Sequence, residues 1–187
     1  MISEEEKALE PFFNSAKYWN FEELLNIVEI SKPRLSYWLK KFEKEGTIKR
    51  PKLNSVMQKS KMPYYTYNFN NSNYHNRKAG FTLKLLNESG LIKYLQSLKD
   101  AKVIIIYGSF ISGDWYDDSD VDVFIYGNIG DIIDAPWVGL GWKGLLRVVE
   151  FHTFQTKEQI RNISLGFMKN VAKGYFVKGD LKDLEIK

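Results

Sequence analysis

Two aspartates separated by one valine, Asp120 and Asp122, open a short strand-like run in the second half of this chain. Residues two apart on a strand project from the same face, with about 6.5–7 Å between their Cα atoms, so the two carboxylates should lie side by side. Like charges on a half-buried strand are unfavourable unless something neutralises them, and a divalent cation with oxygen ligands does so. The spacing therefore predicts a site for Mg²⁺ or Mn²⁺.

A Gly-Ser turn precedes the aspartates. An apolar run over residues 103–106 leads through a tyrosine into Gly108 and Ser109. Gly108 lets the backbone approach a ligand closely because it has no Cβ. Ser109 can donate its hydroxyl and backbone N–H to a phosphate. An isolated Gly-Ser pair is usually an ordinary turn between a strand and a helix, but beside two metal-binding carboxylates it indicates a phosphate site and hence nucleotide chemistry.

The segment that joins these features, residues 107–125, reads YGSFISGDWYDDSDVDVFI. It resembles the signature of the DNA polymerase beta-like nucleotidyltransferases, which is Gly followed by Gly or Ser, a spacer, and then Asp-apolar-Asp/Glu-apolar. The resemblance implies a small core with a mixed sheet flanked by helices. It also implies that Gly108 and Ser109 bind a nucleoside triphosphate and that Asp120 and Asp122 are catalytic metal ligands. One position departs from the family, because many small members carry a spacer arginine where this chain has Ile-Ser-Gly at 111–113.

The family also implies a third carboxylate on a neighbouring strand, and Glu150 is the best candidate. It lies in a strand-like run, residues 145–154, and shares a face with Val148 and His152. Glu150 would complete the metal site or deprotonate the attacking hydroxyl; an edge-strand glutamate facing water is the alternative. A lone histidine such as His152 is more often an ordinary polar residue, so we assign it no role. The Gly- and Trp-rich segment 127–144 suits a lid or an acceptor-facing loop.

Positive charge is concentrated in the first half of the chain. Residues 1–80 hold 14 Lys and Arg against 9 Glu, whereas residues 81–187 hold 13 against 14 acidic residues. Within residues 31–61 the count is 10 against 2. Such a patch favours contact with nucleic acid, and a merely solvated basic face is the alternative.

The same half has the pattern of three helices followed by two strands. Capping residues and apolar spacing predict helices over 3–15, 20–28 and 31–46, and strands over 47–50 and 64–69. The run SKPRLSYWLKKFEKEGTIKR, residues 31–50, resembles the recognition helix and first wing strand of winged helix-turn-helix regulators. That resemblance implies binding to DNA or RNA, and it suggests a homodimer because such domains often bind two-fold sites. The residues expected to contact nucleic acid are Lys32, Arg34, Tyr37, Lys40, Lys41 and Arg50.

Composition narrows the setting. The chain has no cysteine, which excludes disulfides and thiolate metal sites, and no apolar run approaches the ~20 residues of a membrane span. The N-terminus is acidic and unlike a signal peptide, so we expect a cytoplasmic protein without membrane contact. We predict an α/β (α+β) protein with a winged helix-turn-helix domain over 1–70, a polar linker over 71–81 and a nucleotidyltransferase domain over 82–187.

Three functions fit these patterns. We favour a Mg²⁺- or Mn²⁺-dependent enzyme that moves a nucleoside monophosphate, AMP first, from a triphosphate to a hydroxyl of a protein or nucleic acid recruited by the winged helix. The second is a nucleic-acid-binding transcriptional regulator whose nucleotidyltransferase-like domain senses nucleotide or has lost turnover. The third is a nucleic-acid-binding module in which the carboxylates are only structural.

Overall fold

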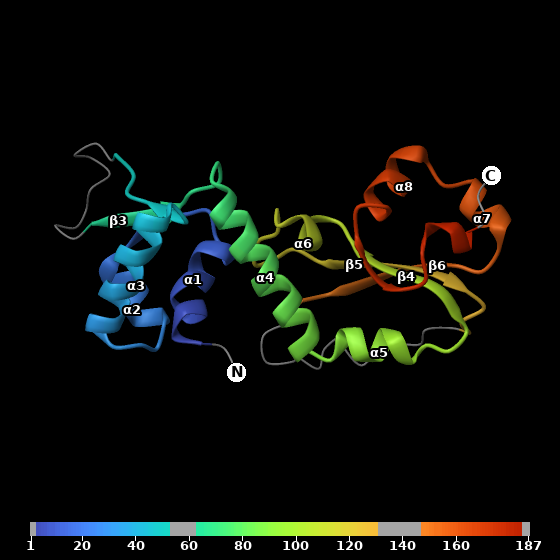
Figure 1. The fold of residues 1–187 in the computed structure, drawn as a ribbon, viewed down its shortest axis with the longest axis horizontal. Helices are drawn as coiled ribbons and strands as arrows, with labels where there is room; N and C mark the ends of the chain where they lie inside the picture. The colour runs from blue at the N-terminus through green and yellow to red at the C-terminus, as the bar shows by residue number, and fades with distance from the viewer. Residues whose placement is uncertain (1–2, 53–62, 131–146, 185–187) are drawn as a thin grey trace. The chain divides into compact units, whose positions relative to one another are not determined.

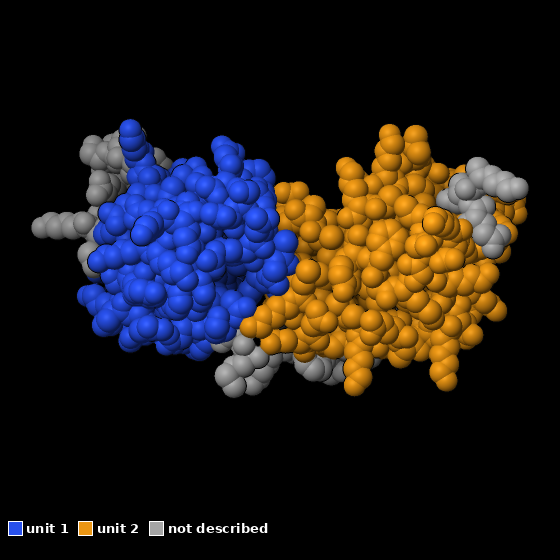
Figure 2. Space-filling model, viewed as in Figure 1, with its two compact units in different colours: residues 1–81 blue, residues 82–187 orange. Residues whose placement is uncertain are grey.

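The chain forms two compact units, residues 1–81 and 82–187, which Figure 2 distinguishes by colour. A computed structural model describes residues 3–52, 63–130 and 147–184. Most of the segment 127–144, for which the sequence suggested a lid, lies outside these residues. Among the helices that are described, none is both long enough and apolar enough to cross a membrane.

Unit 1 contains three short helices and a small antiparallel sheet. The helices begin where the sequence predicted: Ser3 and Asn20 each accept a hydrogen bond in a capping box, and Gly46 ends the third helix in the left-handed conformation, with φ of 76°. The strands lie in the order β1-β3-β2. The elements are α1 (Glu4–Asn14), β1 (Trp19–Asn20), α2 (Phe21–Ile27), α3 (Lys32–Glu45), β2 (Ile48–Lys49) and β3 (Tyr64–Tyr67).

The segment expected to be a linker is instead helical. Helix α4 (Ser72–Glu88) begins within it and continues past residue 81. The sequence did not reveal the part of this helix before residue 82 because its buried stripe contains a lysine: Tyr74, Lys78 and Phe81 are all nearly fully buried at helical spacing. The Lys78 ammonium donates to the Tyr74 hydroxyl at 3.4 Å, which makes the burial of its charged end tolerable.

Unit 2 is a four-stranded mixed sheet covered by helices, which confirms the mixed α/β architecture predicted for this half. Figure 1 shows α5 on one side of the sheet and α7 and α8 on the other. A single helix was expected over 82–98, but Gly90 adopts a left-handed conformation with φ of 78° and divides it into α4 and α5. The elements are α5 (Leu91–Ser97), β4 (Ala101–Tyr107), α6 (Ser109–Ser112), β5 (Val121–Gly127), β6 (Val149–Phe154), α7 (Lys157–Arg161), α8 (Leu165–Val171), β7 (Tyr175–Lys178) and a 3₁₀ turn, Leu181–Leu184.

The strand order, β6-β5-β4-β7, brings the ends of three strands together. Strand β4 is antiparallel to β5, so the end of β4 lies beside the start of β5, and β5 is parallel to β6. The register pairs Tyr107 with Asp122, and Asp122 with Glu150. The Gly-Ser turn, the aspartates and the glutamate therefore meet at one end of the sheet.

Candidate active site

One face of the sheet changes from aromatic to ionisable along β5 and β6. Phe124 and Phe154 stack with ring centroids 5.1 Å apart inside the core that α7 and α8 cover. On the same face, Asp122 lies two residues before Phe124 on β5, and His152 lies two residues before Phe154 on β6. Glu150 comes two residues before His152 and lies opposite Asp122. Polar side chains therefore emerge where the aromatic layer ends, which leaves them accessible while packing fixes their backbones.

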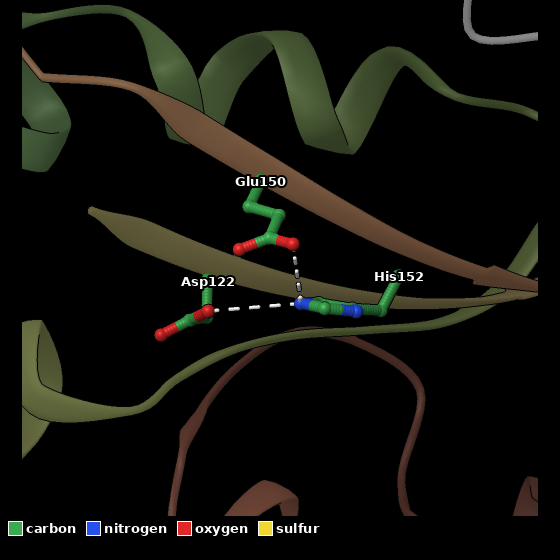
Figure 3. Close-up of side chains that lie close together, drawn as sticks. All are labelled: Asp122, Glu150 and His152. Carbon is green, nitrogen blue, oxygen red and sulfur yellow. Dashed lines mark ion pairs between the residues drawn. The ribbon is translucent and has the colours of Figure 1, made fainter.

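Asp122, Glu150 and His152 form a compact group (Figure 3). The His152 Nε2 atom lies 3.6 Å from Asp122 Oδ1 and 3.8 Å from Glu150 Oε1. One nitrogen or oxygen of each residue lies within 4.8 Å of the corresponding atoms of the other two. These are atoms that coordinate divalent metal ions in proteins, so the donor set fits a cation.

The electrostatics of Asp122 also fit a cation site. Burial raises the pKa of its carboxyl group, His152 opposes that shift, and the negative charges of Glu150 and Asp120 add to it. Burial, together with the charges of Asp122 and Glu150, also raises the pKa of the neighbouring Tyr107 hydroxyl. A bound cation would favour the ionised form of the Asp122 carboxyl group, which this environment disfavours.

Asp120 lies just before β5, is exposed, and stands outside the compact group. Of the three carboxylates predicted to be catalytic, the structure brings Asp122 and Glu150 together. The third member of the group is His152, which the sequence had left without a role. Its alternation with Glu150 on β6 was the signal that could have identified it.

Both the backbone conformation at position 108 and the nearby Asp122 carboxylate favour glycine there. Its φ of 80° and ψ of −162° suit glycine, and a Cβ added there would overlap the Asp122 carboxylate. The aspartate thus packs directly against the Gly-Ser turn. Any larger residue at 108 would displace the carboxylate.

A cavity of about 410 Å³ opens beside the same turn. It lies between the Gly108–Ser109 segment and the last turn of α8. Its charged lining residues in the described chain are Lys173 and Asp114, and Asp114 accepts a hydrogen bond from the Ser112 hydroxyl at 2.8 Å. Its lining residues are Gly108, Ser109, Ile111, Ser112, Asp114, Asn170, Lys173 and Gly174.

Arg147 fixes the loop that leads to the aspartates. Its Nη1 donates to three backbone carbonyls, those of Tyr116 at 2.5 Å, Ser119 at 2.8 Å and Asp117 at 3.2 Å. The guanidinium also lies over the Trp115 ring, 4.6 Å from its centroid. Burial lowers the pKa of Arg147, and the nearby aspartates of this loop oppose the shift. Arg147 was not among the predicted site residues, because nothing in its sequence position links it to a loop some thirty residues earlier.

In unit 1, half of the residues predicted to contact nucleic acid already have acidic partners. Among the described residues no ion pair is seen for Lys32 or Lys40, which line a second cavity of about 410 Å³ together with Arg50 and Tyr65. Tyr37 is 53% exposed. The paired residues are Arg34 with Glu4 at 2.6 Å, Lys41 with Glu5 at 3.2 Å, and Arg50 with Glu43 at 3.1 Å.

Comparison with known families supports the chemistry of unit 2. A family model described as "Polymerase beta, Nucleotidyltransferase" matches residues 89–137. The match includes the Gly-Ser turn and both aspartates, and it ends before Glu150. No curated protein and no solved structure matched the chain. The fold, the site and this match together support a function of the nucleotidyltransferase class, with a nucleoside triphosphate as the substrate that the class implies.

Proposed function

We propose that this protein transfers a nucleoside monophosphate, AMP first, from a triphosphate to a hydroxyl of a protein or nucleic acid. The observation that carries the proposal is the juxtaposition of Asp122, Glu150 and the Gly108–Ser109 turn within the segment similar to the polymerase beta family. In this reaction the acceptor oxygen forms a bond to the α-phosphorus as the bond to pyrophosphate breaks. The hydroxyl proton passes to Glu150 or to solvent.

Asp120, Asp122 and Glu150 would hold Mg²⁺ or Mn²⁺. When bound, the ion would neutralise charge on the α-phosphate and make the acceptor hydroxyl easier to deprotonate. Asp122 is oriented by its contact with Gly108, and Glu150 by the β5–β6 pairing. Asp120, at the exposed start of β5, would complete the site from the solvent side.

The cavity beside the turn suits the triphosphate. Ser109 would donate its hydroxyl and backbone N–H to phosphate oxygens, and Asn170 offers a further donor from α8. Lys173 supplies positive charge to this cavity in a chain that lacks the spacer arginine of many small family members. We infer that Lys173 takes over this role, since a triphosphate in a partly enclosed cavity needs cationic partners.

Unit 1 would recruit the acceptor. The element order α1-β1-α2-α3-β2-β3, with the strands arranged as β1-β3-β2, supports a winged helix-turn-helix. Lys32 and Lys40, which have no ion pair among the described residues, and the exposed Tyr37 support contact with DNA or RNA. A docking surface for a protein acceptor fits the same residues. The homodimer and the cytoplasmic setting expected from the sequence belong to this proposal.

The alternative is a nucleic-acid-binding regulator whose second unit senses nucleotide without turnover. The specific observation in its favour is Asp114, a carboxylate that lines the same cavity as Lys173. Repulsion between Asp114 and phosphate would weaken binding of the substrate.

Radiolabel transfer distinguishes the two functions. The protein is incubated with Mg²⁺ or Mn²⁺ and with each nucleoside triphosphate labelled in turn at the α- or γ-phosphate, together with DNA and RNA oligonucleotides. Label appearing on protein or nucleic acid from the α-position only identifies nucleotidyl transfer. Asp122→Asn should remove it, whereas Asp118→Asn, an exposed loop aspartate with the same change of charge, should retain it. Nucleotide binding without transfer to any acceptor tested would favour the regulator.

A further inference from the structure

We propose that His152 is a metal ligand and that it makes this site select a transition-metal dication, with Mn²⁺ as its representative, over Mg²⁺. The inference rests on the proposed function, because it concerns the ion that serves the same carboxylates. The residues that carry it are Asp122, Glu150 and His152.

The geometry places an imidazole nitrogen where a third ligand would be. In Figure 3 the His152 ring nitrogen points between the two carboxylates rather than away from them. Its distances of 3.6 Å to Asp122 and 3.8 Å to Glu150 lie between the spacings of adjacent and of opposite ligands of one octahedral ion. Ligands about 2.1 Å from an octahedral metal lie roughly 3 Å apart when adjacent and roughly 4 Å when opposite. Side-chain shifts of less than about 1 Å would therefore bring the imidazole nitrogen to the spacing of adjacent ligands from both carboxylates.

The imidazole is also held in this direction. The His152 ring lies against Tyr107, with centroids 5.8 Å apart, and against the edge of Phe167 at 5.7 Å. Its backbone pairs with Phe124 in the parallel β5–β6 ladder. A ligand whose orientation is fixed by packing loses little conformational entropy when the metal binds.

The chemistry of the donors determines which ion is preferred. Mg²⁺ is a hard cation that takes oxygen ligands and gives up water reluctantly, so an imidazole contributes little to its binding. Mn²⁺ accepts carboxylate oxygens as Mg²⁺ does but also binds imidazole, and the later transition dications bind imidazole more strongly. An imidazole donor from His152 in addition to the carboxylates therefore shifts the preference of the site away from Mg²⁺.

A purely electrostatic role for His152 makes the opposite prediction. If it served only as a counter-ion of the two carboxylates, its removal would free them and leave Mn²⁺ affinity unchanged or increased. If it is a ligand, its removal must weaken Mn²⁺ binding. The sign of the change thus separates the two roles.

The test uses the full-length protein without nucleotide, titrated calorimetrically with Mn²⁺ and with Mg²⁺. We expect the wild type to bind Mn²⁺ at least about tenfold more tightly than Mg²⁺. His152→Gln should weaken Mn²⁺ binding by about 10- to 100-fold and Mg²⁺ binding by less than about threefold. His75→Gln removes the only other histidine, which lies in unit 1, and should change neither affinity.

Pulsed electron paramagnetic resonance of the Mn²⁺ complex supplies a direct signature. Hyperfine coupling to an imidazole ¹⁴N should be present in the wild type and in His75→Gln and absent from His152→Gln, and thermal melting curves confirm that the variants fold. Equal affinities for Mn²⁺ in wild type and His152→Gln, a gain in the variant, or absence of nitrogen coupling would overturn the inference. Nucleotide binding is measured separately: a His152-dependent Mn²⁺ site that binds no triphosphate would leave the inference standing and overturn the proposed function.

Discussion

The two units treat charge in opposite ways. On α3 of unit 1, Arg34 and Lys41 are matched by glutamates of α1 at 2.6 and 3.2 Å. In unit 2, Asp122 and Glu150 lie opposite each other on adjacent strands, and His152 is the basic side chain paired with them among the described residues. In unit 1 these two basic side chains are neutralised by acidic neighbours. In unit 2 an excess of negative charge remains at a partly buried end of the sheet. We infer from this comparison that unbalanced like charge is a better guide to a candidate ligand site than the total charge of a segment is.

The largest effect expected is the loss of transfer activity in Asp122→Asn. The amide removes one negative charge and a metal-binding oxygen while its shape is retained, so transfer should fall by at least about 10³-fold, or about 4 kcal/mol in transition-state stabilisation. The rate of α-label transfer measures this. Asp118→Asn in the preceding loop is the matched control, and an equal loss in both variants would show that Asp122 has no special role.

A smaller but still large effect is expected at Arg147. Arg147→Lys retains a positive charge but cannot donate to the carbonyls of Tyr116 and Ser119 in the same geometry. Because these bonds position the loop that leads into Asp120, metal affinity should fall by about tenfold, as for other residues that orient ligands. Calorimetry measures the affinity, and amide hydrogen exchange over 116–120 should become faster. Unchanged exchange and affinity would mean that the loop is held by its other contacts.

In unit 1 we expect two substitutions that each remove one positive charge to weaken nucleic-acid binding by different amounts. Lys40→Ala should weaken binding to a DNA or RNA oligonucleotide. The slope of log K against log salt concentration should fall by about one, as expected for the loss of one phosphate contact. Arg34→Ala should do less, because its guanidinium already pairs with Glu4. Fluorescence anisotropy at several salt concentrations measures both, with the exposed Lys44→Ala as control. Larger losses for Arg34 than for Lys40 would show that the ion pair opens when nucleic acid binds.

The smallest effect expected is on stability. Because burial raises the pKa of Asp122, the folded protein binds this proton more tightly than the unfolded chain. The resulting stabilisation is present below the ordinary pKa of 3.8 and is lost as the pH rises through the folded-state value. Metal-free Asp122→Asn should therefore be more stable than wild type at pH 7, by about 0.5–1 kcal/mol, and the difference should shrink toward pH 4. Thermal melting at both pH values measures it, and a variant less stable at pH 7 would contradict the argument.

Local sequence signals predicted much of the fold. The capping residues Ser3 and Asn20, the Gly46 helix end and the strands on either side of the Gly-Ser turn all follow from rules that act over a few residues. The part of helix α4 before residue 82 escaped prediction because Lys78 occupies its buried stripe, where a sequence pattern expects an apolar residue.

The sequence predicted the strands that carry the candidate site, but not which side chains come together there. Period-two alternation placed Glu150 and His152 on one face, yet only the register between β5 and β6 shows that this face meets Asp122. The same register, with β5 beginning after Asp120, leaves that aspartate outside the compact group. Arg147 depends on contacts between segments far apart in the chain, for which no local signal exists.

The central claim is that the end of the unit 2 sheet binds a nucleoside triphosphate together with a divalent metal. Calorimetric titration of the full-length protein with a nonhydrolysable ATP analogue tests it most directly, with Mg²⁺, with Mn²⁺ and with neither, on wild type, Asp122→Asn and Asp118→Asn. The account predicts metal-dependent binding that Asp122→Asn abolishes and Asp118→Asn retains. Failure of the wild type to bind any of the four nucleoside triphosphates with either metal, or binding that is indifferent to Asp122, would contradict it.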